Sequence, residues 1–382
     1  MAASMLQKFQ GTLVGAIVGD CIGSVFEGLS WASVVGTEKV VKLVEKIEDD
    51  HKNSEEGTAK KQKKDFYEFT DDSAMARSVA KSLIQNNGLD VKDMAKRFTR
   101  EYLRESDRGY GGSVTTVFHA LADSNYEDVF QPAKDQFEGQ GSYGNGGSMR
   151  ICPAGLFAEK KNLDFNQLRD LTEKITLLTH SHVQAIHGAI LQSYAVQLAL
   201  RTTTLDIDSF LQELISKMQV LEQEALQEKQ KRKAEMAEKE EQVEAAEKSE
   251  SKSEEEEKEP DYPYCAKLAK IRDFVRREEL PDPNEIRDEL GVYIAALDSV
   301  PAAIYCFLRA SKPIEELKDR NAFERTIMYA ISLGGDTDTV ATMAGSIAGA
   351  HYGLDLIPSS WQLCCEGRLD AMKDAEQLFN LT

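Results

Sequence analysis

Two short acidic segments, one in each half of the sequence, contain residue types that bind divalent cations. "TDD" at residues 70–72 and "GGDTDT" at residues 334–339 each combine two carboxylates with a threonine hydroxyl. These oxygen-only sets suit magnesium, calcium or manganese better than zinc, because thiolate and imidazole donors are absent. The candidate ligands are Thr70, Asp71, Asp72, Asp336, Asp338 and Thr339. If the two segments meet in the fold, they would hold two ions, and the ions would offset the cost of burying four carboxylates.

Each acidic segment also precedes a pattern typical of an amphipathic helix. Met75, Val79 and Leu83 share one helical face after the first segment, and "VATMAGSI" gives the same spacing after the second. A helix start is a competing interpretation of the first segment, because Thr70 can cap the helix while the aspartates complement the positive end of its dipole. That interpretation is the stronger one for the first segment alone, whereas the two segments together favour metal binding.

Two further acidic residues lie in "GAIVGDCIGSVFEG", residues 15–28. Glu27 is in a loop bounded by Gly23 and Gly28, where a lone glutamate would usually be surface decoration. Asp20 falls where the preceding helix should be packed against the core. We expect Asp20 to be a buried group that supports the ligands, in preference to a helix-end cap.

Two glycine-rich segments could bind a phosphate. "FEGQGSYGNGG" at residues 137–147 leads into an apolar helical run, and "DRGYGGSVTTVF" at residues 107–118 repeats the arrangement. Glycine backbone before a helix N-terminus can surround a phosphate with N–H donors, and Phe137 and Tyr143 could stack on a base. Either segment alone is weak evidence. His180 could cap a helix C-terminus or hydrogen-bond a ligand, and no Ser–His–Asp or Cys–His signature of a nucleophile is present.

The elements that must position these residues are predicted to be helices. Apolar residues recur at three- and four-residue spacing, whereas the period-2 alternation typical of strands is scarce. We therefore predict an all-α fold, a single compact multi-helix domain over residues 1–382 with the metal site at helix N-termini. The predicted helices span roughly residues 5–19, 72–86, 91–104, 113–122, 148–158, 165–179, 183–200, 207–220, 264–277, 284–290, 293–309, 322–333, 339–351 and 368–379.

The first helix has a glycine at every fourth position, at residues 11, 15, 19 and 23. Because each glycine weakens an isolated helix by about 1 kcal/mol relative to alanine, the stripe predicts close packing against a neighbouring helix. Two other stretches look inserted. Residues 44–64 are polar and charged, which predicts a loop, and residues 221–260 are acidic, which predicts a solvated or fraying helix followed by disorder.

The composition limits the classes of function. A net charge of -19 argues against direct DNA binding, because nucleic-acid affinity depends on Lys and Arg neutralising phosphates. The six cysteines contain no CxxC pair, which indicates reduced thiols and no zinc site. The longest apolar run, residues 12–26, is interrupted by Asp20, so we expect no membrane span. No leader sequence and no exposed apolar stripe are evident, and we expect an intracellular monomer.

These motifs, in this order and spacing, resemble the dimagnesium ADP-ribosylhydrolase (ADP-ribosylglycohydrolase) family, specifically its ADP-ribosylhydrolase 3 branch. The resemblance covers nearly the whole chain, except that the acidic stretch at 221–260 is longer than we expect for the branch. The motifs that carry it are "GAIVGDCIGSVFEG", "FTDDSAMA", "GSYGNGGSMR", "LLTH" and "SLGGDTDTVATMAGSIAGA".

The resemblance implies a role for each candidate residue. Two Mg²⁺ ions would be held by the six ligands named above together with Glu27, which in the branch moves when substrate binds and favours serine linkages. Glu27, Asp71 and Asp72 would be catalytic, and Asp71 would also contact substrate. The implied substrate contacts are Gln140, Gly141, Ser142, Tyr143, Gly144, Asn145 and Gly146 in one loop, with Phe137, His180 and Ile294. Phe137 and Tyr143 would face the adenine.

The implied activity is removal of ADP-ribose from serine on proteins, with degradation of poly(ADP-ribose) and O-acetyl-ADP-ribose. ADP-ribosylated proteins and poly(ADP-ribose) would be the substrates and ADP-ribose the product, in the nucleus and cytoplasm and also in the mitochondrial matrix. Glu27 is the first candidate for proton transfer, while Asp71 or Asp72 could position the attacking water. Two alternatives remain open from the sequence: a catalytically silent ADP-ribose-binding relative, and a metal-dependent nucleotide phosphohydrolase.

Overall fold

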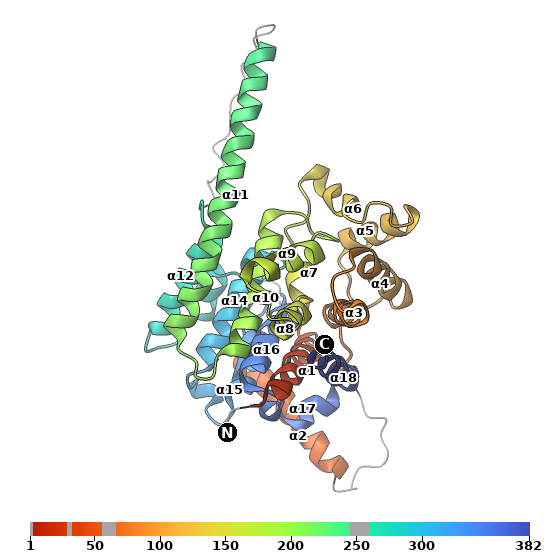
Figure 1. Ribbon diagram of the computed structural model, residues 1–382. Helices are drawn as coiled ribbons and strands as arrows, with labels where there is room; N and C mark the ends of the chain where they lie inside the picture. The colour runs from red at the N-terminus through yellow and green to blue at the C-terminus, as the bar shows by residue number, and fades with distance from the viewer. Residues whose placement is uncertain (1–2, 29–32, 56–65, 245–259) are drawn as a thin grey trace.

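The computed structural model describes residues 3–28, 33–55, 66–244 and 260–382, and helices account for the regular structure within them (Figure 1). The all-α prediction is therefore confirmed. The helices are α1 (Met5–Gly23), α2 (Thr37–Glu55), α3 (Asp71–Asn86), α4 (Val91–Arg104), α5 (Gly112–Asp123), α6 (Gln131–Lys134), α7 (Gly146–Met149), α8 (Cys152–Lys160), α9 (Phe165–Thr176), α10 (Val183–Arg201), α11 (Ile207–Glu244), α12 (Pro263–Arg276), α13 (Pro283–Glu289), α14 (Ala296–Ala310), α15 (Ala322–Ser332), α16 (Thr337–Tyr352), α17 (Ser359–Cys364) and α18 (Arg368–Phe379).

Two helices far apart in the sequence, α1 and α16, form the centre of the molecule. They make the most extensive helix–helix contact, with α14 and α15 packed on α16 and with α18 packed on α1 (Figure 1). Nearly every residue of both helices is buried. None of the described helices has the length and apolar character needed to cross a membrane.

The glycine stripe of α1 produces this contact. A Cβ atom at Gly11 would lie 2.6 Å from the carbonyl oxygen of Gly349, and Gly15 and Gly19 face Gly345 and Ala341 in the same way. The pairing runs in opposite directions along the two helices, so they are antiparallel. The C-terminal end of α1 consequently lies beside the N-terminal end of α16, where Thr337 Oγ1 donates a hydrogen bond to the Gly23 carbonyl at 2.9 Å.

The prediction of a loop at residues 44–64 is wrong for its first half. Residues 44–55 continue α2, whose Val40, Val44 and Ile47 are buried on one face. The charged residues that suggested a loop occupy the other face of this amphipathic helix. The rest of the predicted loop, residues 56–64, lies outside the described residues.

The second inserted stretch is predicted correctly as a solvated helix, but its start is misplaced. Leu221 and Glu222 are still buried, and exposed side chains predominate only from residue 223 to residue 235. The Glu222 carboxylate accepts hydrogen bonds from the backbone N–H groups of Tyr264 (2.6 Å) and Cys265 (3.1 Å), at the first turn of α12. Beyond this point α11 projects from the body (Figure 1). Residues 245–259, where disorder was expected, are outside the described residues.

The close packing of α1 on α16 predicts a specific cost for a methyl group at their contact. Substituting Gly11→Ala places a Cβ against backbone, which cannot move aside, so we expect the free energy of unfolding to fall by about 1–3 kcal/mol despite the better helix propensity of alanine. Chemical denaturation measures this change.

Gly112→Ala is the matched control, because Gly112 is in the first turn of α5 with nothing near its Cβ position. Its stability should stay level or rise. An unchanged stability of Gly11→Ala would contradict the packing described here.

Candidate functional site

The two acidic segments identified in the sequence meet at neighbouring helix N-termini. Thr70 caps α3, with Asp71 and Asp72 in its first turn, and α16 begins just after Asp336. Thr339 Oγ1 donates a hydrogen bond to Asp72 Oδ1 at 3.3 Å, which joins the two segments directly. The structure therefore brings together residues separated by more than half of the chain.

The buried side chain of Asp20 fixes α3 in this position. Its carboxylate accepts hydrogen bonds from the backbone N–H groups of Thr70, at 3.0 and 3.1 Å, and of Ser73, at 3.1 Å. Since Asp20 belongs to α1, it attaches the N-terminus of α3 to the same helix that packs on α16. Asp20 is buried, as expected, and its hydrogen bonds hold the start of α3.

The turn into α16 depends on two glycines in the left-handed region. Gly334 and Gly335 have φ values of 77° and 76°, which favour glycine strongly. The Asp336 N–H then donates to the Val292 carbonyl at 2.8 Å. The Asn145 side-chain amide donates to Asp336 Oδ2 at 2.7 Å, so the glycine-rich loop also holds the second acidic segment.

Burial, and then repulsion between neighbouring carboxylates, raises the pKa of several of these acidic side chains. Burial, reinforced by the charges of Asp20 and Asp336, raises the pKa of Asp71 to about 8. Burial also raises the pKa of Asp72 and of Asp338 well above the usual range, with neighbouring carboxylates as the second cause. The Glu27 side chain is exposed at the edge of the cluster, where partial burial and then the charge of Asp336 raise its pKa.

These residues fit hard divalent cations by their chemistry. Asp72 Oδ2 and Asp338 Oδ1 are buried without a hydrogen-bond partner, so each has a lone pair that a cation would satisfy. Thr70, Thr339, Asp71, Asp336 and Glu27 add oxygen donors around them. Among the described residues, no three His, Cys, Asp or Glu side chains are already gathered as a chelating group.

The predicted substrate loop borders the carboxylates. It is joined to residues 294–296 by hydrogen bonds from Asn145 N to Ile294 O (2.8 Å) and from Ala296 N to Tyr143 O (3.1 Å). Tyr143, Ile294 and Phe137 are each about half exposed, at 51%, 55% and 53%. Phe137 has a φ of 51°, a backbone conformation that non-glycine residues rarely adopt.

The remaining loop residues differ in exposure. Gln140 is exposed, Gly141 packs against Ser181 and His182, and the buried Ser142 accepts a hydrogen bond from the Gly144 N–H at 3.2 Å. The exposed apolar side chains around this loop are therefore those of Phe137, Tyr143 and Ile294.

His180 lies beneath this loop and does not cap a helix. Its helix, α9, ends at Thr176, and the imidazole is buried against Gly144 and Gly146. A Cβ at Gly146 would lie 2.7 Å from His180 Cε1. Burial lowers the pKa of His180 to about 3, with Arg150 as the second cause, so the ring is neutral and cannot complement a helix dipole.

Sequence reasoning missed two residues beside the carboxylates. Arg150 is buried within electrostatic range of Asp71, although burial lowers the pKa of its guanidinium to about 9. Tyr110 has a buried hydroxyl without a hydrogen-bond partner, also near Asp71. One indication in the sequence suggested that Arg150 could matter: it is a cationic residue at the end of "GNGGSMR", just before an apolar helix.

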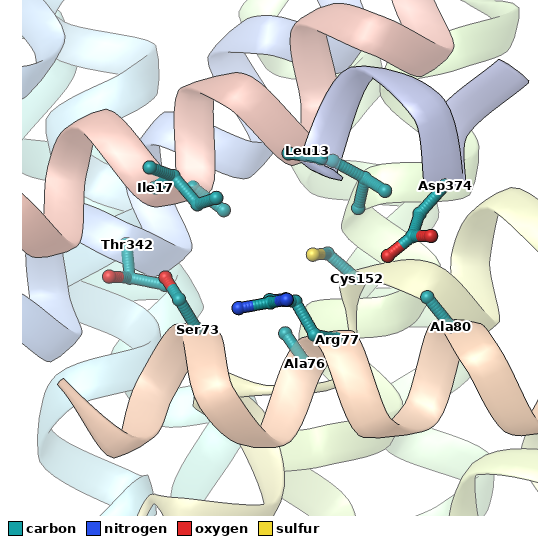
Figure 2. A pocket seen from close by; sticks show the side chains of 11 residues that line it. Leu13, Ile17, Ser73, Ala76, Arg77, Ala80, Cys152, Thr342 and Asp374 are labelled. Atoms are coloured by element: carbon teal, nitrogen blue, oxygen red, sulfur yellow. The ribbon is translucent and has the colours of Figure 1, made fainter. Parts of the chain in front are cut away.

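A small cavity, lined mainly by apolar side chains, lies between α1, α3 and α18. Its four polar lining residues are Ser73, Arg77, Thr342 and Asp374, and Figure 2 shows the Arg77 guanidinium at the cavity. All four side chains have a buried polar atom without a hydrogen-bond partner. The cavity volume of about 20 Å³ is sufficient for one water molecule, which could satisfy some of these groups.

Comparisons with known proteins show which family the chain resembles. Residues 1–382 match the family model described as ADP-ribosylglycohydrolase. The chain is 40% identical over 370 residues to "ADP-ribosylhydrolase ARH3" of Homo sapiens, covering 96% of this chain and 91% of the relative. It is 40% identical over 385 residues to the Xenopus tropicalis protein of that name, covering 100% and 97%. A solved structure titled "ADP-ribosylglycohydrolase-related protein complex" has the same fold, with a TM-score of 0.59 at 21% identity and coverage of 99% and 98%.

The raised carboxyl pKa values predict how the stability of the metal-free protein depends on pH. The folded pKa of Asp71 is about 8, and its unfolded value is about 3.9, so the folded state binds more protons between these values. Stability in chelator should therefore fall as pH rises from about 4 to about 8. Added Mg²⁺ should raise the melting temperature more at pH 8 than at pH 6, because it binds the deprotonated carboxylates. Thermal unfolding with and without chelator measures both effects.

Asp338→Asn is the informative variant, since it removes one buried carboxylate while keeping the side-chain volume. Its metal-free stability should fall less with pH, and its response to Mg²⁺ should be smaller. A metal-free melting temperature that stays level or rises from pH 5 to pH 8 would contradict the pKa assignments.

Proposed function

This chain belongs to the ADP-ribosylglycohydrolase family, and from that premise we propose that it is a magnesium-dependent hydrolase of O-linked ADP-ribose. Similarity to the ARH3 proteins along the chain supports ADP-ribosylhydrolase activity. The proposed substrates are ADP-ribose attached to serine on proteins, the ribose–ribose bonds of poly(ADP-ribose), and O-acetyl-ADP-ribose.

One observation carries the proposal: two acidic helix N-termini converge next to a glycine loop with exposed aromatic side chains. The contact of Thr339 with Asp72 joins the two N-termini, and the contact of Asn145 with Asp336 joins them to the loop. The proposed cation site and the proposed nucleotide-binding loop would therefore be in direct contact. This arrangement suits a substrate with a sugar at one end and a base at the other.

The acidic cluster would hold two Mg²⁺ ions through Thr70, Asp71, Asp72, Asp336, Asp338, Thr339 and Glu27. When bound, the ions would supply Lewis-acid polarisation at the reacting ribose and orient its hydroxyls. The helix N-termini of α3 and α16 add partial positive charge on the same side. As in other glycoside cleavages, the transition state should resemble an oxocarbenium ion.

Glu27 is the proposed group for proton transfer. Its side chain is exposed at the edge of the cluster, yet burial and the charge of Asp336 raise its pKa, so it can exchange a proton closer to neutral pH than an ordinary glutamate. It would donate to the departing serine oxygen or accept a proton from the attacking water. Asp71 or Asp72 could position that water.

The loop from Gln140 to Gly146 would bind the nucleotide part of the substrate. Tyr143 and Phe137 present exposed rings that can stack on adenine, with Ile294 on the adjoining backbone. The backbone N–H groups of the loop would face phosphate oxygens. The strained backbone at Phe137 is consistent with a residue held in place for binding.

Release of ADP-ribose from a serine-modified peptide tests the proposal. We expect release with Mg²⁺, none with chelator, and a decrease of about 100- to 10,000-fold in turnover for Glu27→Gln, since a general acid or base contributes on this scale. Affinity for ADP-ribose should change little in this variant. Glu38→Gln is the matched control, because Glu38 is an exposed α2 residue paired only with Lys42.

The other outcomes identify the alternatives. Tight ADP-ribose binding with no release from any substrate would indicate a catalytically silent relative. AMP produced from free ADP-ribose would indicate a nucleotide phosphohydrolase. Equal turnover of Glu27→Gln and the parent protein would refute the proton-transfer assignment alone.

A further inference from the structure

A buried chain of hydrogen bonds connects Arg150 to His180. The Arg150 guanidinium donates from one amino group to Thr179 Oγ1 at 2.6 Å and to the Ile175 carbonyl at 3.3 Å. Its guanidinium carbon lies 4.5 Å from the centre of the Phe98 ring. Thr179 Oγ1 is 2.7 Å from His180 Nδ1. Arg150 and Thr179 are 1% and 0% exposed, so water does not compete for these contacts.

The direction of these bonds follows from the donors available. Arginine has no acceptor atom, so Thr179 Oγ1 must accept from Arg150. The hydroxyl proton of Thr179 then needs an acceptor, and the contact that offers one is His180 Nδ1. If Nδ1 carried a proton instead, the fully buried Thr179 hydroxyl would face two donors and keep its own proton unsatisfied, which buried polar groups rarely do.

We propose that Arg150 and Thr179 are positioning residues that fix His180 as the neutral tautomer with its proton on Nε2, so that His180 donates a hydrogen bond at the glycine loop to an oxygen of the bound ligand. Nε2 lies on the loop side of the ring, because Cβ atoms built at Gly144 and Gly146 would be 3.4 and 3.0 Å from it. The inference rests on the proposed function only for the identity of the ligand, an ADP-ribose diphosphate or ribose oxygen.

The charges around His180 favour the same state. Protonating Nδ1 would create a second buried cation beside Arg150, and the Arg150 charge is one cause of the lowered pKa of His180. Arg150 also faces Asp71 and Tyr110. The Arg150 charge therefore acts on both Asp71 and His180. It disfavours the charged imidazolium, so that His180 stays neutral and can still donate a hydrogen bond from Nε2.

Nitrogen-15 NMR of histidine-labelled full-length protein tests the tautomer directly. The His180 signals are assigned by comparison with His180→Asn. We expect an unprotonated Nδ1 and a protonated Nε2, unchanged from pH 5 to pH 8. Thr179→Val keeps the shape but removes the hydroxyl, so it should give a mixed tautomer or a titrating ring, whereas Thr179→Ser should behave as the parent protein. An Nδ1–H tautomer or an imidazolium at pH 7 in the parent protein would overturn the proposal.

Binding of ADP-ribose by calorimetry provides the functional readout. Affinity should fall about tenfold in Thr179→Val, the scale of one neutral hydrogen bond, and should stay within about threefold in Thr179→Ser. Thr99→Val is the control for replacing a buried threonine, since Thr99 bonds only within α4. Unchanged affinity in Thr179→Val would also overturn the proposal.

The two inferences fail separately. If the parent protein binds no ADP-ribose but His180 shows the expected tautomer, the proposed function fails and the positioning roles of Arg150 and Thr179 stand. If ADP-ribose binds and the tautomer is wrong, the reverse holds.

Discussion

The contact between α1 and α16 is the constraint on which the rest of the structure depends. Four glycines on α1 allow the backbones of α1 and α16 to touch. This contact fixes the axial register of the two helices as well as the distance between them. The end of α1 therefore lies beside the start of α16, and Asp20 on α1 can attach the start of α3 there. Without that register, Asp72 and Thr339 would not meet.

Collecting so many carboxylates at one place opposes folding, and the fold compensates only in part. Helix N-termini supply partial positive charge to Asp72 and Asp338, and Arg150 supplies one buried cation. Oxygen atoms of Asp72 and Asp338 still have no partner. If the cluster binds divalent cations as proposed, their binding energy would offset this cost and stabilise the folded state.

The sequence predicted those features of the fold and site that depend on neighbouring residues, and it missed those that depend on contacts between distant segments. The "TDD" and "GGDTDT" segments were recognisable because ligand type and helix starts are local properties, and the glycine stripe on α1 indicated a close neighbour. Its partner, α16, could not be inferred, since it lies more than 300 residues away. Arg150 was missed because its role comes from groups brought together only by folding. The charge of residues 44–55 obscured the buried face of α2. The roles proposed for Glu27 and His180 came from the resemblance alone.

The Glu222 contact holds α11 and the start of α12 together. By binding the backbone at the start of α12, Glu222 fastens the outgoing and returning chain together at the surface of the body. The two ends of the segment between Glu222 and Tyr264 are therefore held next to each other. A change in the length of this segment would affect the stability of the body mainly through loop-closure entropy, which grows slowly with length. The Glu222 contact thus separates the length of this segment from the geometry of the carboxylate cluster.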